Sequence, residues 1–303
     1  MTDRRPTHGD PLFILAMDHR DSFGKSLFDV KDDRPTDDQA ARMRKAKDLI
    51  YTGLRDARSA LPAGRPGVLV DEQYGQAVID RAKSDDVVLA VPVEASGHDW
   101  FTLEWGDEWL EHVRRIRPAY AKVLVRDNPD LPSGRRDKQL ADLGEISAGL
   151  ASAHVPLLYE LLVPGTDEQL ASVGGDSDRY DRDVRPALVV RVIMDNLANG
   201  VAPALWKVEG LETVDDARLV AAAARSGQHD SDLIVLGRDA PDDRLNHWLE
   251  VASRVPEFVG FAIGRSIWED AIDDWVQGRA DDAETSAKVA DAYLGFARHW
   301  RDR

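Results

Sequence analysis

A lysine interrupts one of the short apolar runs of this chain. Lys207 directly follows Ala204-Leu205-Trp206, and Val208-Glu209-Gly210 then leads into a helical pattern. Lysine is depleted in strands and is almost never fully buried without a partner or a task. An edge-strand lysine facing water would explain the pattern. So would an amine kept in a dry pocket, where it can form a Schiff base with a carbonyl substrate.

Charged side chains recur where the other apolar runs end, and several are Lys or Arg although the formal net charge is -16. They could form a solubilising rim, but their recurrence favours a site. They are Asp18, His19 and Arg20; Asp71 and Glu72; Glu94; Lys122 and Arg126; Glu160; Lys207 and Glu209; Arg238; and Arg265.

The spacing of these residues predicts which of them meet. Lys122 and Arg126 share one face of their strand, because side chains alternate with a period of two. Lys122 and Lys207 belong to the fourth and sixth strands, so they can share one layer of a barrel. A second ammonium and partial desolvation favour a neutral amine, the form that attacks a ketone. Glu160, on the strand between, could move protons, form a buried salt bridge, or do both.

Two glycine-containing strand ends are candidates for phosphate binding. Gly237-Arg238 follows the seventh strand, and Gly264-Arg265-Ser266 follows the eighth. In barrels, phosphate often binds at this place, held by backbone N–H groups, a helix N-terminus and a cation. The alternative is a turn glycine followed by an arginine that faces solvent.

The elements that must position these residues alternate regularly. Eight short runs rich in Val, Ile and Leu, without polar alternation, are separated by helical patterns, which is typical of a parallel sheet buried on both faces. The runs cover residues 12–17, 68–70, 87–93, 119–125, 155–162, 202–210, 233–236 and 258–263. This order predicts a (β/α)8 barrel in one domain over residues 1–303. A doubly wound fold is disfavoured, since no Gly-x-Gly-x-x-Gly follows the first strand.

The amino-acid composition argues against several classes of partner and ligand. The acidic balance argues against nucleic acid, and no apolar run is long enough to span a membrane. The chain has no cysteine, and its histidines form no metal-binding pattern, so we expect neither a metal nor another cofactor. The N-terminus lacks a secretory signal, which favours a cytoplasmic protein.

In this order and spacing, eight short motifs resemble a known family. They are MDHR (17–20), LVDEQYG (69–75), PVE (92–94), AKVLVR (121–126), ELLVP (160–164), WKVEG (206–210), VLGR (235–238) and FAIGRSIW (261–268). The chain is similar to the aldolase-like barrel that forms the C-terminal part of some bacterial inositol-catabolism proteins fused to a sugar kinase. That family is usually assigned as 2-deoxy-5-keto-gluconate 6-phosphate aldolase. More distantly, the chain resembles class I tagatose-bisphosphate aldolases.

The resemblance implies a Schiff-base lyase with Lys207 as the amine. Lys122, Glu160 and Asp18 would surround the carbonyl, and Arg265, Gly264 and Arg238 would hold phosphate. The remaining substrate-binding candidates at the strand ends are His19, Arg20, Asp71, Glu94, Arg126, Gly237 and Ser266. The chain departs from the family by carrying no kinase domain and by Ala95, where many relatives have Lys. The second departure leaves the substrate head group open.

The sequence therefore predicts a class I aldolase that cleaves a phosphorylated or similarly anionic ketose and assembles as a homo-oligomer. An isomerase or epimerase that uses the same acids without covalent chemistry is one alternative. A barrel that only binds a sugar phosphate and regulates a partner is another. The active-site interpretation requires Lys207 to point inward and to lie within about 6 Å of Lys122 or Glu160.

Overall fold

The computed structural model contains a closed barrel of eight parallel strands, in the order β1 to β8, which confirms the predicted (β/α)8 fold. It describes residues 5–32, 34–62, 64–227, 229–238 and 240–301. The strands are β1 (Leu12–Ala16), β2 (Arg65–Leu69), β3 (Val88–Pro92), β4 (Tyr120–Arg126), β5 (Leu157–Leu162), β6 (Leu205–Glu209), β7 (Asp232–Leu236) and β8 (Phe258–Ile263).

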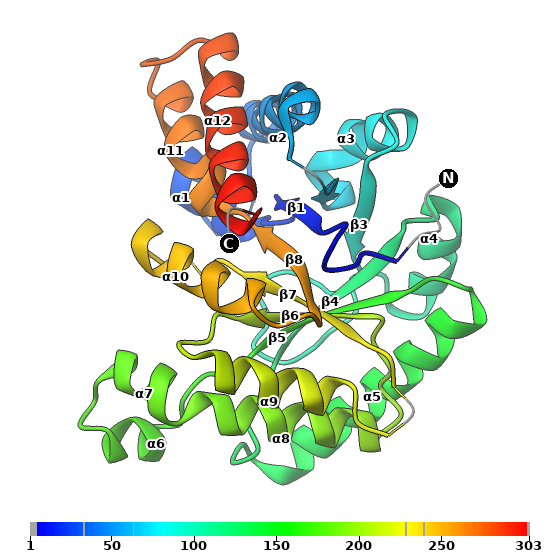
Figure 1. The fold of residues 1–303 in the computed structure, drawn as a ribbon. Helices are drawn as coiled ribbons and strands as arrows, with labels where there is room; N and C mark the ends of the chain where they lie inside the picture. The colour runs from blue at the N-terminus through cyan, green and yellow to red at the C-terminus, as the bar shows by residue number, and fades with distance from the viewer. Residues whose placement is uncertain (1–4, 33, 63, 228, 239, 302–303) are drawn as a thin grey trace.

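Helices surround the strands (Figure 1). They are α1 (Asp21–Phe28), α2 (Asp37–Ala57), α3 (Glu72–Ser84), α4 (Trp109–Ile116), α5 (Ser133–Ser152), α6 (Asp167–Ser172), α7 (Ser177–Asp183), α8 (Arg185–Ala198), α9 (Val214–Ala224), α10 (Asp242–Ser253), α11 (Arg265–Val276) and α12 (Asp282–Arg301). Two short 3-10 helices are η1 (Arg58–Ala60) and η2 (Gly106–Glu108).

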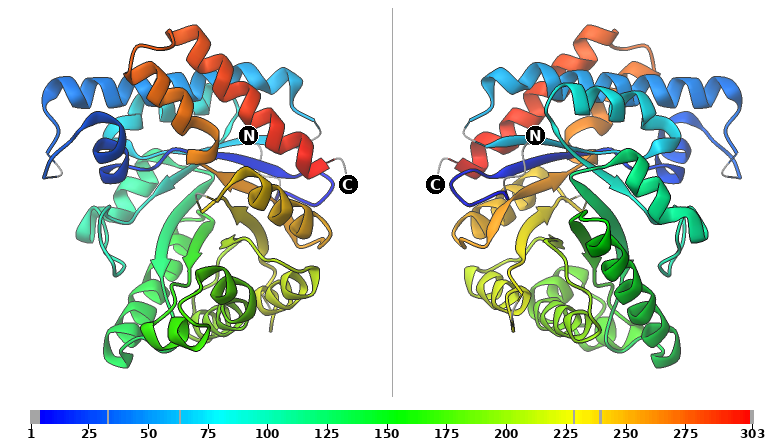
Figure 2. Two further views of the ribbon diagram at one scale, coloured as in Figure 1. Left: turned by 90° about the vertical axis from the view of Figure 1, so that its left-hand side faces the viewer. Right: turned by 90° about the vertical axis from the view of Figure 1, so that its right-hand side faces the viewer.

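Helix α2, from the N-terminal part of the chain, packs against the C-terminal helix α12. Figure 2 shows α2 and α12 crossing on one side of the barrel. Ser286 on α12 donates a hydrogen bond to the Leu49 carbonyl at 3.1 Å. At this crossing a Cβ on Gly53 would lie 2.6 Å from the Ser286 carbonyl oxygen, so the close approach of the two helices requires a glycine.

The alternation of side chains along the strands determines what lies inside the barrel. One buried apolar cluster fills the interior below the mouth, and it includes Leu12, Ile14 and Ala16 of β1, Leu158 of β5 and Leu205 of β6. Two residues further along β5 and β6 the inward position is charged: Glu160 follows Leu158, and Lys207 follows Leu205. The inter-strand register pairs Leu158 with Leu205 and Glu160 with Lys207. A charged layer therefore lies directly above an apolar one.

Two elements differ from the sequence prediction. The polar stretch after β1 contains α1, which buries Phe23, Leu27 and Phe28 although its other positions are polar. Strand β2 begins at Arg65, earlier than the apolar run, because Pro66 and Gly67 adopt strand geometry opposite β1. Between β5 and α8 the chain forms the short helices α6 and α7.

Within the described ranges, no helix is both long and apolar enough to cross a bilayer.

We expect Gly260→Ala to destabilise the barrel by about 3 kcal/mol or more. Gly260 has φ +141°, and an added Cβ would lie 1.9 Å from the Leu12 carbonyl oxygen, where β8 pairs with β1. Gly295→Ala in α12 is the matched control: nothing lies within 4 Å of its added Cβ. Its better helix propensity should stabilise by up to about 1 kcal/mol. The free energy of unfolding in urea measures both substitutions. Equal changes in the two variants would contradict the close pairing of β8 with β1 at Gly260.

Candidate active site

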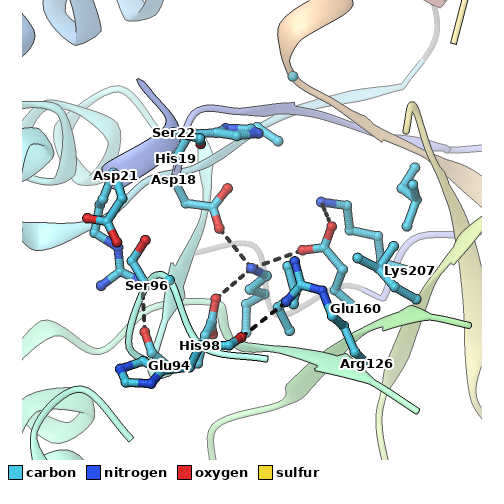
Figure 3. A pocket seen from close by; sticks show the side chains of 18 of the residues that line it. Asp18, His19, Asp21, Ser22, Glu94, Ser96, His98, Arg126, Glu160 and Lys207 are labelled. Atoms are coloured by element: carbon cyan, nitrogen blue, oxygen red, sulfur yellow. Dashed lines mark hydrogen bonds and ion pairs between the residues drawn. The ribbon is translucent and has the colours of Figure 1, made fainter. Parts of the chain in front are cut away.

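Three carboxylates surround one buried ammonium at the mouth of the barrel. Lys122 is 1% exposed, and its Nζ lies 2.8 Å from Asp18 Oδ2, 2.7 Å from Glu94 Oε1 and 2.9 Å from Glu160 Oε2. These carboxylates come from the ends of β1, β3 and β5 (Figure 3). Three acceptors match the three donors of an ammonium group, so Lys122 is fully engaged.

Glu160 connects this ammonium to a second one. Its other oxygen, Oε1, lies 2.7 Å from Nζ of Lys207, which is 4% exposed. Lys207 therefore points into the barrel and not outward, as the active-site interpretation requires. Each lysine contacts a different oxygen of one carboxylate (Figure 3). Glu160 therefore bridges Lys122 and Lys207.

Burial and the ion pairs set the protonation states of this cluster. Burial alone would lower the pKa of Lys122, but Asp18, Glu160 and Glu94 together raise it well above its ordinary value. Burial would raise the pKa of Asp18 and of Glu160, but both are lowered, chiefly by the two lysines. Lys122 therefore stays an ammonium, while Asp18 and Glu160 stay ionised.

Glu94 and His19 behave differently from these groups. Burial raises the pKa of Glu94, and its Oε2 is buried without a hydrogen-bond partner among the described residues. Burial lowers the pKa of His19 to about 4, with Lys207 and Arg265 acting in the same direction, and its Nδ1 is also buried without a partner. His19 is thus neutral at physiological pH.

The cluster lies at the base of a pocket of about 530 Å³. The pocket brings together residues from the ends of β1, β3, β4, β5, β6, β7 and β8. Of the residues singled out from the sequence, those that line it are Asp18, His19, Arg20, Glu94, Lys122, Arg126, Glu160, Lys207, Gly237, Arg238, Gly264, Arg265 and Ser266.

Glu72 and Glu209, two of the strand-end charges, do not line this pocket. Among the predicted substrate-binding residues Asp71 is the exception, and that prediction is not retained. It does not line this pocket; its carboxylate forms a short contact with Lys47 and accepts a hydrogen bond from Tyr74 N at 2.8 Å, capping α3. Lys47 is fully buried and also donates to the carbonyls of Met17 at 2.7 Å and His19 at 3.0 Å. This pair therefore fixes the backbone on both sides of Asp18.

Two predicted cations line the pocket but are paired with carboxylates. Arg20 donates to Glu104 Oε2 at 2.8 Å and to the Glu94 carbonyl at 2.7 Å, so it ties the β1 end to the β3 end. Arg238 lies 2.7 Å from Asp181 and 3.0 Å from Glu209, with φ +47°. Its charge is balanced within that network, which makes it a weaker phosphate ligand than the sequence suggests.

The carboxyl end of β8 has the features of an anion-binding site, as the sequence predicts. Gly264 precedes α11, and a Cβ on it would lie 2.7 Å from the Ala16 carbonyl oxygen and 3.0 Å from the His19 ring. Glycine is therefore required for β8 to approach β1 here. Arg265 and Ser266 form the first turn of α11, whose N-terminus can bind a negative charge.

Sequence reasoning missed Lys47 and the loop that follows β3. Lys47 follows Met43 by four residues and precedes Ile50 by three, so it lies on the buried stripe of α2, which was a usable signal. Ser96 and His98 line the pocket from the loop after Glu94. Their position depends on the path of that loop, which no periodicity predicts.

No arrangement of three or more His, Cys, Asp or Glu side chains suited to a metal ion occurs in the described part of the chain. The three carboxylates at the centre of the pocket are instead arranged around the ammonium of Lys122.

Fold and site together define a (β/α)8 barrel with a buried, carboxylate-bridged lysine pair at the carboxyl ends of its strands. The chain belongs to the DUF2090 family, described as an uncharacterized protein conserved in bacteria, and the match covers residues 1–303. None of the curated proteins matches it.

One of the solved structures that match this chain shares its fold. Cgl0159 from Corynebacterium glutamicum is 17% identical with a TM-score of 0.58, over 93% of this chain and 85% of that chain. A provisionally named fructose-1,6-biphosphate aldolase from Coccidioides immitis is 10% identical with a TM-score of 0.47, over 96% and 87%. A provisionally named phosphonomutase from Burkholderia cenocepacia is 11% identical with a TM-score of 0.46, over 90% and 95%. At 17% identity, the likeness to Cgl0159 shows the barrel fold alone.

We expect Lys47→Met to destabilise the protein by about 3–5 kcal/mol, because it leaves the Asp71 carboxylate buried without its partner. The double variant Lys47→Met with Asp71→Asn should recover much of this loss, since Asn is neutral and can still cap α3. Lys45→Met, an exposed lysine of the same helix, is the control and should have little effect. If urea unfolding shows the double variant to be no more stable than the single one, the buried pair does not act as described.

Stability should also depend on pH through His19. Its folded-state pKa of about 4 lies below the ordinary 6.5, so between these values the unfolded chain binds a proton that the folded chain does not. Stability contributed by His19 is therefore present above about pH 6.5 and is lost as pH falls toward 4. His19→Gln should reduce the slope of the unfolding free energy against pH by up to about 1.4 kcal/mol per pH unit in this window. An unchanged slope in urea titrations would contradict a neutral, buried His19.

Proposed function

We propose that this protein is a class I aldolase, a carbon–carbon lyase that forms a Schiff base between Lys207 and the ketone of an anionic keto-sugar. The observation that carries the proposal is the bridge through Glu160, which touches Lys207 at 2.7 Å and Lys122 at 2.9 Å in a buried pocket. A nucleophilic amine needs such a neighbour, because its proton must have somewhere to go.

The two lysines have different surroundings, and this assigns their roles. Lys122 has three carboxylate partners, which hold it as an ammonium and make it a poor nucleophile. Lys207 has Glu160 as its carboxylate partner among the described residues. Lys207 is therefore the amine that attacks.

The proposed reaction begins when Glu160 takes a proton from Lys207 and the free amine attacks the ketone carbon. Glu160 returns the proton to the carbinolamine hydroxyl, which leaves as water, and an iminium remains. Asp18 then removes the proton of the hydroxyl on the carbon β to the iminium. As it does so, the C–C bond between the α and β carbons breaks. The electron pair of that bond neutralises the iminium and forms an enamine, and an aldehyde departs. Asp18 protonates the enamine carbon, and water hydrolyses the new iminium to release the second product.

The substrate we propose is a phosphorylated ketose or keto-sugar acid. The resemblance in motifs makes 2-deoxy-5-keto-gluconate 6-phosphate one candidate, which would give dihydroxyacetone phosphate and malonate semialdehyde. Its phosphate is one carbon from the ketone and would bind at Gly264, Arg265 and Ser266. The chemistry requires neither a metal nor another cofactor, and we propose that residues 1–303 act as one domain.

We expect Lys207→Ala to lower kcat/KM for C–C cleavage by roughly 10⁴-fold or more, because it removes the nucleophile. Aldehyde release from a panel of phosphorylated keto-sugars provides the assay. Lys138→Ala, an exposed lysine of α5, is the control and should leave cleavage unchanged. Interconversion of isomers that survives in Lys207→Ala would instead favour a non-covalent isomerase. Ligand-dependent thermal stabilisation without turnover would favour a barrel that only binds.

A further inference from the structure

We propose that Glu209 is a positioning residue for the Glu160–Lys207 pair. Its carboxylate joins Arg238 and Asp181 in an ionic clamp, which holds the carboxyl ends of β5, β6 and β7 in fixed register. The inference rests on the proposed function, because it concerns the lysine that would form the Schiff base. It also gives a use to the connection between β5 and α8, which carries Asp181.

Glu209 lies just outside the pocket, on the strand of the proposed nucleophile. It follows Lys207 by two residues on β6, so the two side chains leave the strand on the same side. Glu209 is 5% exposed and does not line the pocket, so it would act through its neighbours and not by contact with the substrate. The last paired residues of β5 and β6 are Leu161 and Val208, one step before Glu209. Glu209 is thus placed to continue the contact between these strands.

One carboxylate oxygen of Glu209 extends the pairing of β6 with β5. Its Oε2 accepts a hydrogen bond from Val163 N at 2.9 Å, three residues after Glu160. The carbonyl of Val163 accepts a second hydrogen bond, from the hydroxyl of Tyr180 on α7 at 2.9 Å. Burial raises the pKa of Tyr180 to about 12, and Glu209 acts in the same direction, so this hydroxyl stays a donor. The end of β5 is therefore held through both backbone polar groups of one buried residue.

The other carboxylate oxygen of Glu209 contacts the end of β7. Oε1 lies 3.0 Å from Nε of Arg238, and Nη1 of Arg238 lies 2.7 Å from Asp181 Oδ1. Arg238 has φ +47°, a left-handed conformation that is unfavourable for a residue with a side chain, and its two ion pairs offset this strain. Each oxygen of Glu209 thus serves a different neighbouring strand, as each oxygen of Glu160 serves a different lysine.

Asp181 completes the clamp from outside the barrel. Helices α6 and α7 lie in the connection from β5 to α8 (Figure 1), and Asp181 on α7 is 3% exposed. Its Oδ1 also lies 3.0 Å from Nε of Arg185, which is fully buried and donates to the Gly210 carbonyl at 2.8 Å. Two arginines and two carboxylates therefore face one another without net charge, and this pairing offsets the cost of their burial.

The clamp fixes the distance on which the proposed proton transfer depends. Glu160 on β5 and Lys207 on β6 lie 2.7 Å apart. A general base must lie within about 2.6–3.2 Å of the group that it deprotonates. A shift of β5 against β6 by about 1 Å would break this contact, and a displacement of that size can cost about 10²-fold in rate. Loss of Glu209 should therefore slow the chemical step, whereas the anion-binding groups at the carboxyl end of β8 stay in place.

The kinetics of 2-deoxy-5-keto-gluconate 6-phosphate cleavage test the positioning role. We expect Glu209→Ala to lower kcat by about 10²-fold and to raise KM by less than about threefold. Glu209→Gln, which keeps an acceptor for Val163 N, should have a kcat between those of Glu209→Ala and the wild type.

Asp232→Ala is the matched control. It also removes a buried carboxylate that pairs with an arginine, but at the start of β7, at the opposite end of the barrel. At temperatures where both variants are folded, Asp232→Ala should have the kcat of the wild type. The comparison separates positioning from a general loss of stability.

Hydrogen exchange measures the clamp without any substrate. The amide of Val163 loses its acceptor in Glu209→Ala and keeps it in Asp232→Ala. We expect this amide to exchange at least about tenfold faster in Glu209→Ala than in Asp232→Ala.

Three results would overturn the positioning role. They are a kcat of folded Glu209→Ala within about threefold of the wild type, an equal loss of kcat in Asp232→Ala, and equal exchange of the Val163 amide in the two variants. A failure of the aldolase proposal would be recognised separately. Lys207→Ala would then keep the activity, while the Val163 amide would still exchange faster in Glu209→Ala.

Discussion

The contact of Lys122 with Asp18, Glu94 and Glu160 is the interaction on which the rest of the site depends. Three carboxylates could not be buried this close together without a cation between them, because their repulsion would protonate or separate them. With Lys122 in place, Asp18 and Glu160 remain ionised, and Glu160 has an oxygen left for Lys207. Lys122 thus acts as the counter-ion of these carboxylates, and in the proposed reaction Lys207 acts as the nucleophile.

The barrel supplies this arrangement through strand register. Leu158 pairs with Leu205 one layer below, and Glu160 consequently pairs with Lys207. The apolar layer beneath excludes water from the lower side of the charges, which strengthens their interactions. A third buried lysine, Lys47, donates to the carbonyls on both sides of Asp18 and fixes the end of β1 from outside the barrel. A buried lysine that contacts several acceptors therefore occurs both within the candidate site, at Lys122, and beside it, at Lys47.

The sequence predicts those features of the structure that depend on local patterns of residues. The barrel, the inward positions of Lys122 and Lys207, and the bridging place of Glu160 follow from apolar runs and a period of two. The partners of Asp71, Arg20 and Arg238 do not, because Lys47, Glu104 and Asp181 come from elements whose side-chain contacts depend on how helices and loops pack. Helix α1 was missed because it buries only one narrow face. The course of the loop after β3 also escapes prediction, because Gly97 with φ +79° sets it and no repeating pattern of residues records such a turn.

The central claim is that Lys207, and not Lys122, forms the covalent intermediate. Reduction with borohydride in the presence of substrate, followed by mass spectrometry of the peptides, tests it most directly. The account predicts one stable adduct per chain, located on Lys207 and absent from Lys207→Ala. An adduct on Lys122 would contradict the assignment of roles. Undiminished cleavage in Lys207→Ala, without any adduct, would contradict the Schiff-base chemistry itself.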